Sequence, residues 1–376
     1  MEYRKMDKLD VAPSLLGFGC MRFPKKEDGK IDEERAEKMI DLAIKKGVTY
    51  LDTAYPYHNG DSEPFLGRVL NKYNRSSYLL ATKLPVWNVE RKGDATKIFN
   101  EQLKRLDKDY VDFYLLHALD RDKWKKVLKL DILGEIEALI KEGKIRYFGF
   151  SFHDTYDVFE EILTYRNWDF CQIQYNYLDT DIQAGDRGYA LTAKMGVPLV
   201  IMEPIKGGNL VNLPGDLSSL FTDYDQSKSL ASWALRWVGS HDNVKVILSG
   251  MSDEEQVEDN LATFNHFTPL NREELAITKQ VHKEIKKRQK NGCTGCGYCM
   301  PCPYGINIPK NFQYWNEASM FNKPERLISG YEDLGKANAS KCKKCGGCEI
   351  LCPQHISIRD DLKMIVKDVK KAKRAR

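Results

Sequence analysis

The chain has 376 residues, of which 42% are hydrophobic and 30% charged, and its formal net charge is +4. These values are typical of a globular protein and exclude a disordered or fibrous chain, and so small a net charge gives no reason to expect a nucleic-acid partner. No run of 18 apolar residues occurs, so we expect no membrane-spanning helix. The first thirteen residues lack the apolar segment of a secretory signal, and we therefore expect a cytoplasmic protein.

Between residues 15 and 265, short apolar segments rich in β-forming residues alternate with amphipathic stretches. The expected strands are Leu15–Cys20, Thr49–Thr53, Tyr78–Lys83, Val111–His117, Ile145–Ser151, Phe170–Tyr175, Pro198–Glu203 and Val244–Ser249. Strands that alternate with helices predict right-handed crossovers and a parallel sheet. The eightfold count favours a closed (β/α)8 barrel, the TIM barrel, over an open doubly wound sheet. We expect the residues before Leu15 to form a short hairpin across the bottom of this barrel.

The composition changes near residue 270. A charged helix is expected over 269–290, and eight of the ten cysteines follow residue 290. The sequence therefore predicts three parts: a barrel over 1–268, a connecting helix over 269–290, and a small cysteine-rich domain over 291–376. Without an export signal, such clustering indicates metal ligation rather than disulfides. The basic tail from Lys367 is expected to be a solvated helix end.

Four polar residues lie at the ends of four successive expected strands. They are Asp52, Lys83, His117 and Ser151, and their separations of 31, 34 and 34 residues each match about one βα unit. Because the carboxyl ends of barrel strands meet at one mouth, we expect these side chains to face the same site.

This set suits reversible hydride transfer to a carbonyl, which needs a proton donor beside the developing alkoxide. Tyr57 follows Asp52 by five residues and is placed to donate that proton. Lys83 would lower the pKa of the Tyr57 phenol, and Asp52 would hold Lys83. His117 would orient the carbonyl oxygen, while Tyr55 is a competing phenol by chemistry alone.

The segment Asp52-Thr-Ala-Tyr-Pro-Tyr57-His-Asn-Gly-Asp-Ser-Glu63, with Ala81-Thr-Lys83 and Asp112-Phe-Tyr-Leu-Leu-His117, resembles the aldo-keto reductase family. The resemblance extends over about residues 8–265. It implies a catalytic tetrad of Asp52, Tyr57, Lys83 and His117, with Tyr55 as a wall of the pocket. It also implies a nicotinamide cofactor, NAD(P)H, across the barrel mouth and a small carbonyl or alcohol substrate.

The same resemblance assigns the residues that hold the cofactor. Ser151 and Gln172 match the pair that binds the carboxamide, the loop after the seventh strand approaches the phosphates, and residues 250–260 clasp the adenosine end. The expected contacts are Ser151, Gln172, Glu203, Pro204, Lys206, Gly207, Gly250, Ser252, Gln256 and Asn260.

The sequence departs from the family pattern at the adenosine end. Members that select NADP usually carry a lysine and an arginine where Gly250 and Gln256 stand. Glu254 and Glu255 would oppose a 2′-phosphate, so we expect weak discrimination with a slight lean to NADH. Lys206 is an alternative partner for the phosphate.

Two cysteine runs dominate the C-terminal part. The second run, Cys342-x2-Cys345-x2-Cys348-x3-Cys352-Pro353, resembles that of bacterial ferredoxins with [4Fe–4S] clusters. The first run has Cys293, Cys296, Cys299 and Cys302 at successive intervals of three, so two residues rather than three precede its last cysteine. The resemblance covers about 291–358 and implies two clusters in a small ferredoxin-like domain.

Crossed ligation divides the eight thiolates into two sets. The first set is Cys293, Cys296, Cys299 and Cys352; the second is Cys342, Cys345, Cys348 and Cys302. The shortened spacing leaves the place of Cys302 open, and zinc is the alternative metal. Cys20 and Cys171 lie in expected strands and are interpreted as core thiols. Few large apolar residues surround the cysteine runs, so we expect metal ligation to supply much of this domain's stability.

Three functions remain open from the sequence. The first is a nicotinamide-dependent carbonyl/alcohol oxidoreductase whose clusters exchange electrons with a redox partner protein. The second is the same enzyme with clusters that serve structure or redox sensing. The third is an electron-transfer protein that uses the barrel as a scaffold, which the intact tetrad disfavours. Nicotinamide moves two electrons as hydride and a cluster moves one, and no residues here mark a flavin site between them.

Overall fold

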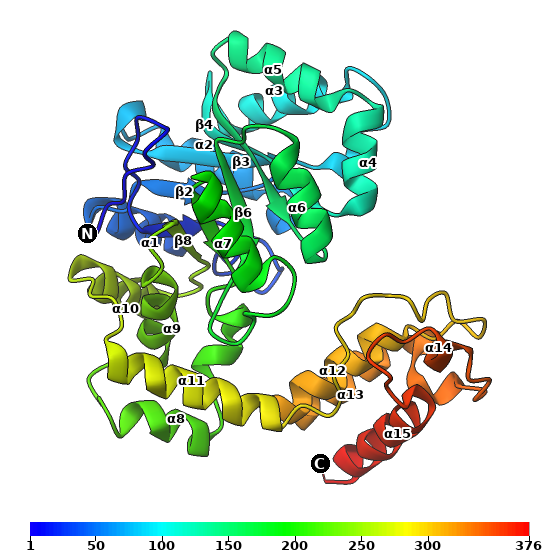
Figure 1. The fold of residues 1–376 in the computed structure, drawn as a ribbon. Helices are drawn as coiled ribbons and strands as arrows, with labels where there is room; N and C mark the ends of the chain where they lie inside the picture. Colours follow the sequence, from blue (N-terminus) through cyan, green and yellow to red (C-terminus); the bar gives the residue numbers. More distant parts are fainter. Residues whose placement is uncertain (376) are drawn as a thin grey trace. The chain divides into compact units, whose positions relative to one another are not determined.

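A computed structural model describes residues 1–375 and contains a closed barrel of eight parallel strands paired in chain order (Figure 1). The strands are β1 (Leu16–Gly19), β2 (Tyr50–Asp52), β3 (Leu79–Leu84), β4 (Val111–Leu119), β5 (Ile145–Phe152), β6 (Phe170–Gln174), β7 (Leu199–Met202) and β8 (Val244–Ser249). Strand β8 pairs with β1 and closes the sheet. The predicted (β/α)8 barrel and all eight of its expected strands are confirmed.

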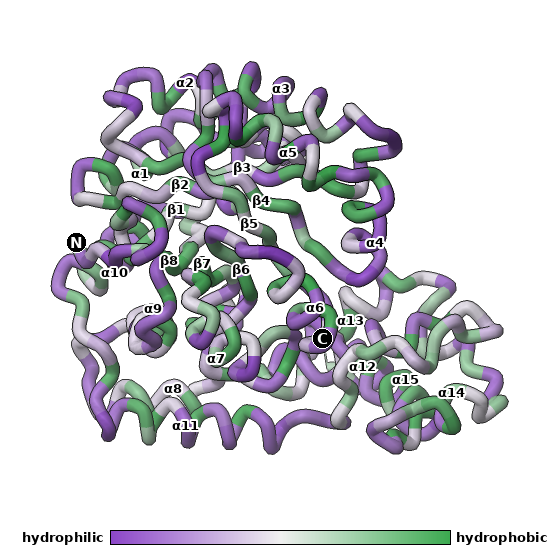
Figure 2. Tube along the Cα trace, turned by 45° about the horizontal axis from the view of Figure 1, so that its top comes forward, coloured by the Kyte–Doolittle hydropathy of each residue, from purple (hydrophilic) through white to green (hydrophobic). Residues whose placement is uncertain are grey.

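Helices surround the strands and bury one apolar face each, as the amphipathic stretches predict. They are α1 (Glu33–Lys45), α2 (Ser62–Leu70), α3 (Asp94–Leu106), α4 (Arg121–Lys129), α5 (Ile132–Lys141), α6 (Tyr156–Tyr165), α7 (Gly185–Met195), α9 (Leu230–Gly239) and α10 (Glu254–Asn265). In α1, for example, Ala36, Met39, Ile40 and Ala43 are buried, and the Asp32 side chain caps the first turn by accepting from Arg35 N. Figure 2 shows the apolar strands inside and the mixed helices outside.

The bottom of the barrel is closed by the N-terminal segment. Antiparallel bridges join Tyr3 to Ser14 and Met6 to Val11, which gives the expected hairpin. Its buried Met6 packs with Phe113 and other side chains that fill the barrel interior. The interior is therefore a packed core below the mouth, and the polar strand ends are left for the opposite rim.

The chain divides into two compact units. The first comprises residues 1–211 and 228–273, and the second comprises residues 212–227 together with those from 274 on. The second unit thus takes helix α8 (Gly215–Thr222), which lies in the long connection between β7 and β8, as well as most of α11 (Arg272–Lys287). An ion pair between Arg288 and Asp216 joins the two segments of this unit. The sequence analysis did not separate residues 212–227 from the barrel.

The cysteine-rich part of the second unit is helical around its loops. It contains α12 (Ile308–Met320), α13 (Pro324–Asp333), α14 (Gly347–Ile350) and α15 (Ile358–Arg374). Its apolar core is made of Ile306, Ile308, Phe312, Trp315, Ala318, Leu327, Ala339, Ile358, Leu362, Ile365 and Val369. This core is larger than the sequence analysis expected, because its residues lie mainly in helices between the two cysteine runs and after the second run, rather than within the runs.

No helix among residues 1–375 is both long enough and apolar enough to cross a membrane.

Candidate functional site

The centre of the barrel mouth is a buried ion pair. Lys83 of β3 is fully buried, and its Nζ donates to Asp52 Oδ1 at 2.5 Å and to the Thr53 carbonyl at 2.8 Å. The same Nζ lies 3.4 Å from the hydroxyl of Tyr57. Asp52 ends β2, and Tyr57 begins the 3-10 turn that follows it. The structure therefore brings three of the four expected tetrad residues into direct contact.

Burial and charge act in opposite directions on these groups. Burial raises the pKa of Tyr57, and the Lys83 ammonium only partly offsets it, so the expected lowering by Lys83 is real but outweighed. Burial alone would lower the pKa of Lys83, but Asp52 and Tyr57 outweigh it and leave the pKa raised. Burial raises the pKa of Asp52 against the opposing pull of Lys83. Lys83 is consequently held as an ammonium, and Tyr57 is held as a neutral phenol at neutral pH.

His117 of β4 completes the group. Its ring centroid is 6.0 Å from that of Tyr57 and 5.1 Å from that of Trp87. Burial, with the positive charge of Lys83 next in effect, brings the pKa of His117 well below its usual value. The imidazole is therefore neutral, with one N–H to donate and one nitrogen to accept. The sequence analysis missed Trp87, because a single aromatic residue in a loop has no distinguishing pattern.

The loop that carries Tyr57 is fixed by a contact from α3. Arg105 donates to the carbonyl oxygens of Tyr55 and Gly60, and its Nε lies 3.2 Å from a carboxylate oxygen of buried Glu63. The hydroxyl of Tyr55, the competing phenol, donates to Glu101 of α3 at 3.0 Å. The loop is thus held on both sides of Tyr57.

Glu63 extends this contact to β3. It accepts from Thr82 Oγ1 at 2.6 Å and from Gln102 Nε2 at 2.7 Å, and Gln102 also donates to the Lys83 carbonyl. Burial raises the pKa of Glu63, opposed by these hydrogen bonds and by Arg105. The loop that carries Tyr57 and the strand of Lys83 therefore share one buried polar network. Arg105 was not singled out from the sequence, since a helical arginine is ordinarily a surface residue.

A second polar pair faces the mouth from β5 and β6. Ser151 Oγ accepts from the amide of Ala118 at 2.7 Å, which leaves its hydroxyl hydrogen free to donate. Gln172 is 2% exposed, and its Oε1 is buried without a hydrogen-bond partner. An unpartnered buried amide oxygen is costly. A carboxamide, which offers both a donor and an acceptor, fits this pair, so the residues present suit a nicotinamide.

The loop after β7 has an unusual backbone. Glu203, Lys206, Gly207 and Gly208 all have positive φ angles, between 50° and 90°. Such a left-handed loop turns amide groups toward one side, as in many phosphate-binding loops. The Lys206 ammonium, however, donates to both carboxylate oxygens of Asp179, at 2.8 and 2.6 Å. Its charge is thereby neutralised, and the structure does not leave it free as a phosphate partner.

At the part of the mouth where the adenosine end is expected, Gly250 lies against an arginine from another element. A Cβ on Gly250 would stand 2.7 Å from Cγ of Arg22, which follows β1. A longer residue at position 250 would therefore displace the aliphatic part of the Arg22 side chain. The sequence analysis missed Arg22 because its proximity arises only when the barrel closes.

Other groups at this end are engaged within the protein. Glu254 forms an ion pair with Arg35 of α1 at 2.7 Å, which offsets the carboxylate expected to oppose a phosphate. Gln256 accepts from Ser252 N and donates to Asp253, so its amide belongs to the cap of α10. Two further expected contacts complete the set: Asn260 is buried and donates to Ser249, and Pro204 lies between Glu203 and the 3-10 turn η4 (Lys206–Val211).

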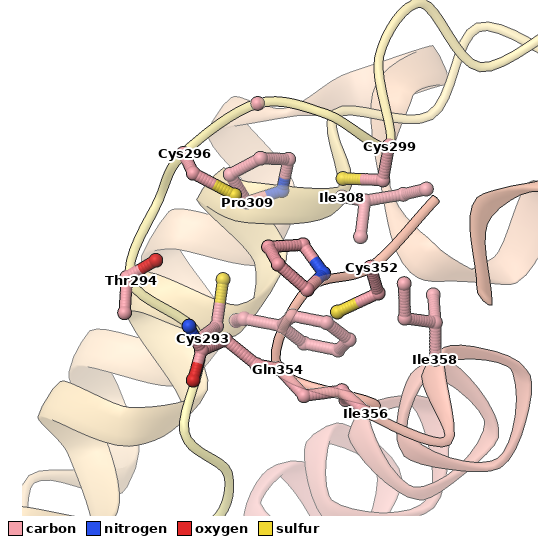
Figure 3. Close-up of a pocket in the computed structure, with 13 residues that line it drawn as sticks. Cys293, Thr294, Cys296, Cys299, Ile308, Pro309, Cys352, Gln354, Ile356 and Ile358 are labelled. Atoms are coloured by element: carbon pink, nitrogen blue, oxygen red, sulfur yellow. The ribbon is translucent and has the colours of Figure 1, made fainter. Parts of the chain in front are cut away.

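Four cysteines line one cavity in the second unit. Cys293, Cys296 and Cys299 come from the first run, and Cys352 is the last cysteine of the second run. Figure 3 shows their sulfur atoms turned toward the space between them, with Ile308, Pro309, Ile356 and Ile358 around it. Burial raises the pKa of Cys293, and neighbouring Cys296 and Cys352 add to the effect. Four converging thiols in an apolar cavity suit a [4Fe–4S] cluster, whose ferric and ferrous ions stabilise thiolates.

The other cysteines are grouped less tightly. Burial raises the pKa of Cys348, and neighbouring Glu349, Cys342 and Cys345 add to the effect, so the thiols of Cys342 and Cys345 both lie near that of Cys348. Cys302 and Cys342 pack against the small helical core, and Cys345 is exposed. Within residues 1–375, no three His, Cys, Asp or Glu side chains converge closely enough for a single metal ion. Cys20 and Cys171 are fully buried in or beside barrel strands, as expected of core thiols.

The fold and the two groups of residues define a barrel oxidoreductase with an iron–sulfur module. Comparison with known proteins gives the same result. The aldo/keto reductase family matches residues 15–283, and a 4Fe-4S dicluster domain matches residues 292–356. The chain belongs to the aldo/keto reductase family and is an NAD(P)H-dependent oxidoreductase with a C-terminal 4Fe–4S domain.

Relatives share the barrel. A probable aldo-keto reductase 1 from Glycine max is 32% identical over 37% of this chain and only 41% of its own length. The NADH-specific methylglyoxal reductase of Escherichia coli is 26% identical over 68% of this chain and 91% of its own. Among solved structures, the holo form of aldo-keto reductase AKR11C1 from Bacillus halodurans is 29% identical, with a TM-score of 0.63 over 75% of this chain and 96% of that chain.

Proposed function

We propose that this enzyme interconverts an aldehyde or ketone and the matching alcohol, with Tyr57 as the general acid/base. The observation that supports this most directly is the placement of the Tyr57 hydroxyl 3.4 Å from a fully buried ammonium that Asp52 holds. The ion pair with Asp52 does not by itself need a phenol beside it, whereas a phenol that gains and loses a proton is served by a fixed ammonium at this distance.

When bound, the nicotinamide supplies or accepts the hydride. In the direction of reduction, Tyr57 donates its proton to the oxygen of the carbonyl as negative charge develops there. Burial keeps the phenol protonated until it is needed, and Lys83 stabilises the phenolate that remains. Neutral His117 donates its N–H to the same oxygen and fixes its direction. Trp87 narrows the mouth beside His117.

We assign Ser151 and Gln172 to the carboxamide of the cofactor and the loop 203–208 to its phosphates. Residues 250–260 take the adenosine end, where Arg22 replaces the missing lysine. The cytoplasmic location expected from the sequence stays a prediction.

For the second unit we propose two [4Fe–4S] clusters. Cys293, Cys296, Cys299 and Cys352 would ligate one of them, and the convergence of these four thiols supports that set. Cys342, Cys345, Cys348 and Cys302 would ligate the other, in the crossed manner of bacterial ferredoxins. The clusters would exchange single electrons with a redox protein. A scaffold function for the barrel is less well supported, because the buried tetrad network has no role in a scaffold.

The test is a pair of matched phenol variants in the full chain purified without oxygen. Tyr57→Phe should lower carbonyl reduction by about 10³-fold, while nicotinamide binding, followed by fluorescence titration, changes little. Tyr55→Phe removes a hydroxyl that contacts only Glu101 and should keep most of the activity. Near-normal reduction by Tyr57→Phe would refute the assignment and direct attention to Tyr55.

A further inference from the structure

The second cysteine run presents two large aliphatic side chains to solvent. Ile350 is 87% exposed and Leu351 is 59% exposed, and both lie between the expected ligands Cys348 and Cys352. A single exposed apolar residue needs no explanation, but two adjacent ones at the tip of a short helix form a protruding apolar contact. They lie outside the core that α12, α13 and α15 form, so the fold of the unit does not use them.

Positive charge lies close to this apolar tip in the sequence, within the same cysteine run. Lys341, Lys343 and Lys344 flank Cys342 and Cys345, and all three are exposed. Within residues 1–375 none of the three takes part in an ion pair, and Lys344 is held at a φ of +59°. We call these three lysines, together with Ile350 and Leu351, the docking face.

The one carboxylate within this run does not offset that charge. Glu349 is paired with Arg359 of α15 at 2.7 Å, and it also accepts from the Arg359 amide at 2.8 Å. The Glu349 carboxylate is thus paired with helix α15 and not with the lysines. Exposed apolar side chains with unpaired lysines in the same run are the complement of an apolar patch that carries anionic groups.

We propose that the docking face binds an acidic one-electron carrier protein. This inference rests on the proposed clusters, because the face surrounds three ligands of one of them and thus offers a carrier a short path to that cluster. One electron passes from the reduced carrier to the oxidised cluster, so the carrier is oxidised and the cluster is reduced, and no bond or proton is exchanged. The apolar tip supplies contact area, and the lysines steer the acidic partner and orient it.

The lysines have a competing explanation that the experiment must separate. Positive charge beside a cluster also stabilises its reduced state and raises its reduction potential. A tuning role would shift the midpoint potential and would not require Ile350 or Leu351. A docking role would change the affinity for the carrier and its salt dependence, neither of which a shift in midpoint potential alone would change.

The experiment uses the full holoprotein, prepared without oxygen, and an acidic flavodoxin as the carrier. Binding is measured by calorimetry, and electron transfer is measured by stopped-flow absorbance at two ionic strengths. Lys343→Glu/Lys344→Glu should weaken binding by about tenfold or more at low salt and abolish the loss of affinity with salt. Ile350→Ser/Leu351→Ser should weaken binding by a similar factor but keep the salt dependence.

Two matched controls carry the same chemical changes elsewhere in the unit. Lys370→Glu/Lys371→Glu alters two exposed lysines of α15, and Met364→Ser alters a 41% exposed methionine of the same helix. Both should bind the carrier as the unaltered protein does. Iron content is measured for every variant, so that loss of a cluster is not mistaken for loss of docking.

Several outcomes would overturn the proposal. One is unchanged carrier binding in both docking-face variants, and another is an equal loss of binding in the α15 controls. A third is a shift in the cluster's midpoint potential that accounts for the whole change in the electron-transfer rate. So would a wild-type dimer that Ile350→Ser/Leu351→Ser dissociates, since a second copy would then occupy the face. Carbonyl reduction with NAD(P)H is followed throughout: its loss in Tyr57→Phe concerns the barrel, and it should be unaffected by the docking-face variants.

Discussion

The barrel mouth and the cysteine loops are organised by opposite means. At the mouth, Lys83 and Asp52 are held by strands, by each other and by the network through Glu63. In the cysteine loops, the thiols project from turns, and Cys296 and Cys345 are exposed. Proton transfer needs groups preset to within fractions of an ångström. Cluster ligation needs only that the thiolates can reach the metal, which then fixes them.

The difference indicates where each part of the molecule is vulnerable. The barrel site should fail when one buried partner is removed, because the other is left without compensation. The iron–sulfur unit should fail when the metal is removed, but only in its loops, because the helices have their own core.

Replacement of Lys83 should have the largest effect on the barrel. Lys83→Met leaves the Asp52 carboxylate buried and unpaired, which should destabilise the barrel by about 3–5 kcal/mol and lower turnover by about 10³-fold. Without Lys83, burial raises the pKa of Asp52 further. A carboxyl whose folded pKa exceeds its unfolded value destabilises the fold at a pH above the folded pKa. The loss of stability in Lys83→Met should therefore shrink as pH falls through the folded pKa of Asp52. Denaturant unfolding at several pH values measures this.

The double variant Asp52→Asn/Lys83→Met separates stability from catalysis. It removes both charges, so most of the lost stability should return while turnover stays low. If the double variant were as unstable as Lys83→Met, an unpaired carboxylate would not be the cause.

Metal removal should show the contrast between the units directly. Protein prepared without oxygen should hold about eight irons per chain, and Cys345→Ala should remove about four. Chelation should disorder the cysteine loops while the barrel keeps its melting temperature and α12 and α15 keep part of their helicity. About four irons in the unaltered chain would mean that the short Cys299–Cys302 spacing costs one cluster. About one zinc per four cysteines, without absorbance near 400 nm, would contradict the iron–sulfur assignment.

The local periodicity of the sequence, and the position of polar residues within its βα repeat, were sufficient to predict the barrel and most of the residues at its mouth. The alternation of strands and helices gave the eight strands, and the spacing of Asp52, Lys83 and His117 placed them at one mouth. Both predictions depend on the βα repeat, whose spacing can be read directly from the sequence. The convergence of Cys352 with the first cysteine run was likewise implied by resemblance to a regular motif.

Contacts between distant segments were not predictable in the same way. Arg22 meets Gly250 only because β1 pairs with β8, and Lys206 is neutralised by Asp179 from the preceding connection. The net pKa of Tyr57 also depends on burial, which the sequence does not express. The core of the second unit was underestimated for a related reason: its residues are spread over helices that meet only in space.

The Arg105 clamp should have a smaller effect on catalysis than the tetrad. Arg105→Lys keeps the charge but loses the forked donors that hold the Tyr55 and Gly60 carbonyls. We expect kcat to fall by about tenfold through misplacement of Tyr57, with little change in KM. Arg35→Lys, at an exposed ion pair, is the control and should retain kcat. An equal loss of kcat in Arg105→Lys and Arg35→Lys, or a rise in KM alone, would argue against a positioning role for Arg105.

The smallest effect is expected at the adenosine end, where cofactor choice is decided. The chain should discriminate between NADH and NADPH by less than about a hundredfold, or ~2.7 kcal/mol. The side chain of Arg22 lies against Gly250 through its aliphatic part, and Lys206 is engaged by Asp179.

Arg22→Ala should therefore weaken NADPH binding by about three- to tenfold, the range of one partly exposed charge contact, and leave NADH binding nearly unchanged. Lys25→Ala, in the same loop after β1, is the control and should alter neither cofactor. Fluorescence titration of both cofactors measures the ratio. If Arg22→Ala weakened the binding of NADH and NADPH equally, Arg22 would contact a group that both cofactors share, such as the pyrophosphate. A strong NADPH preference that survives Arg22→Ala would mean that the left-handed backbone of loop 203–208, rather than any side chain from β1, compensates the additional phosphate.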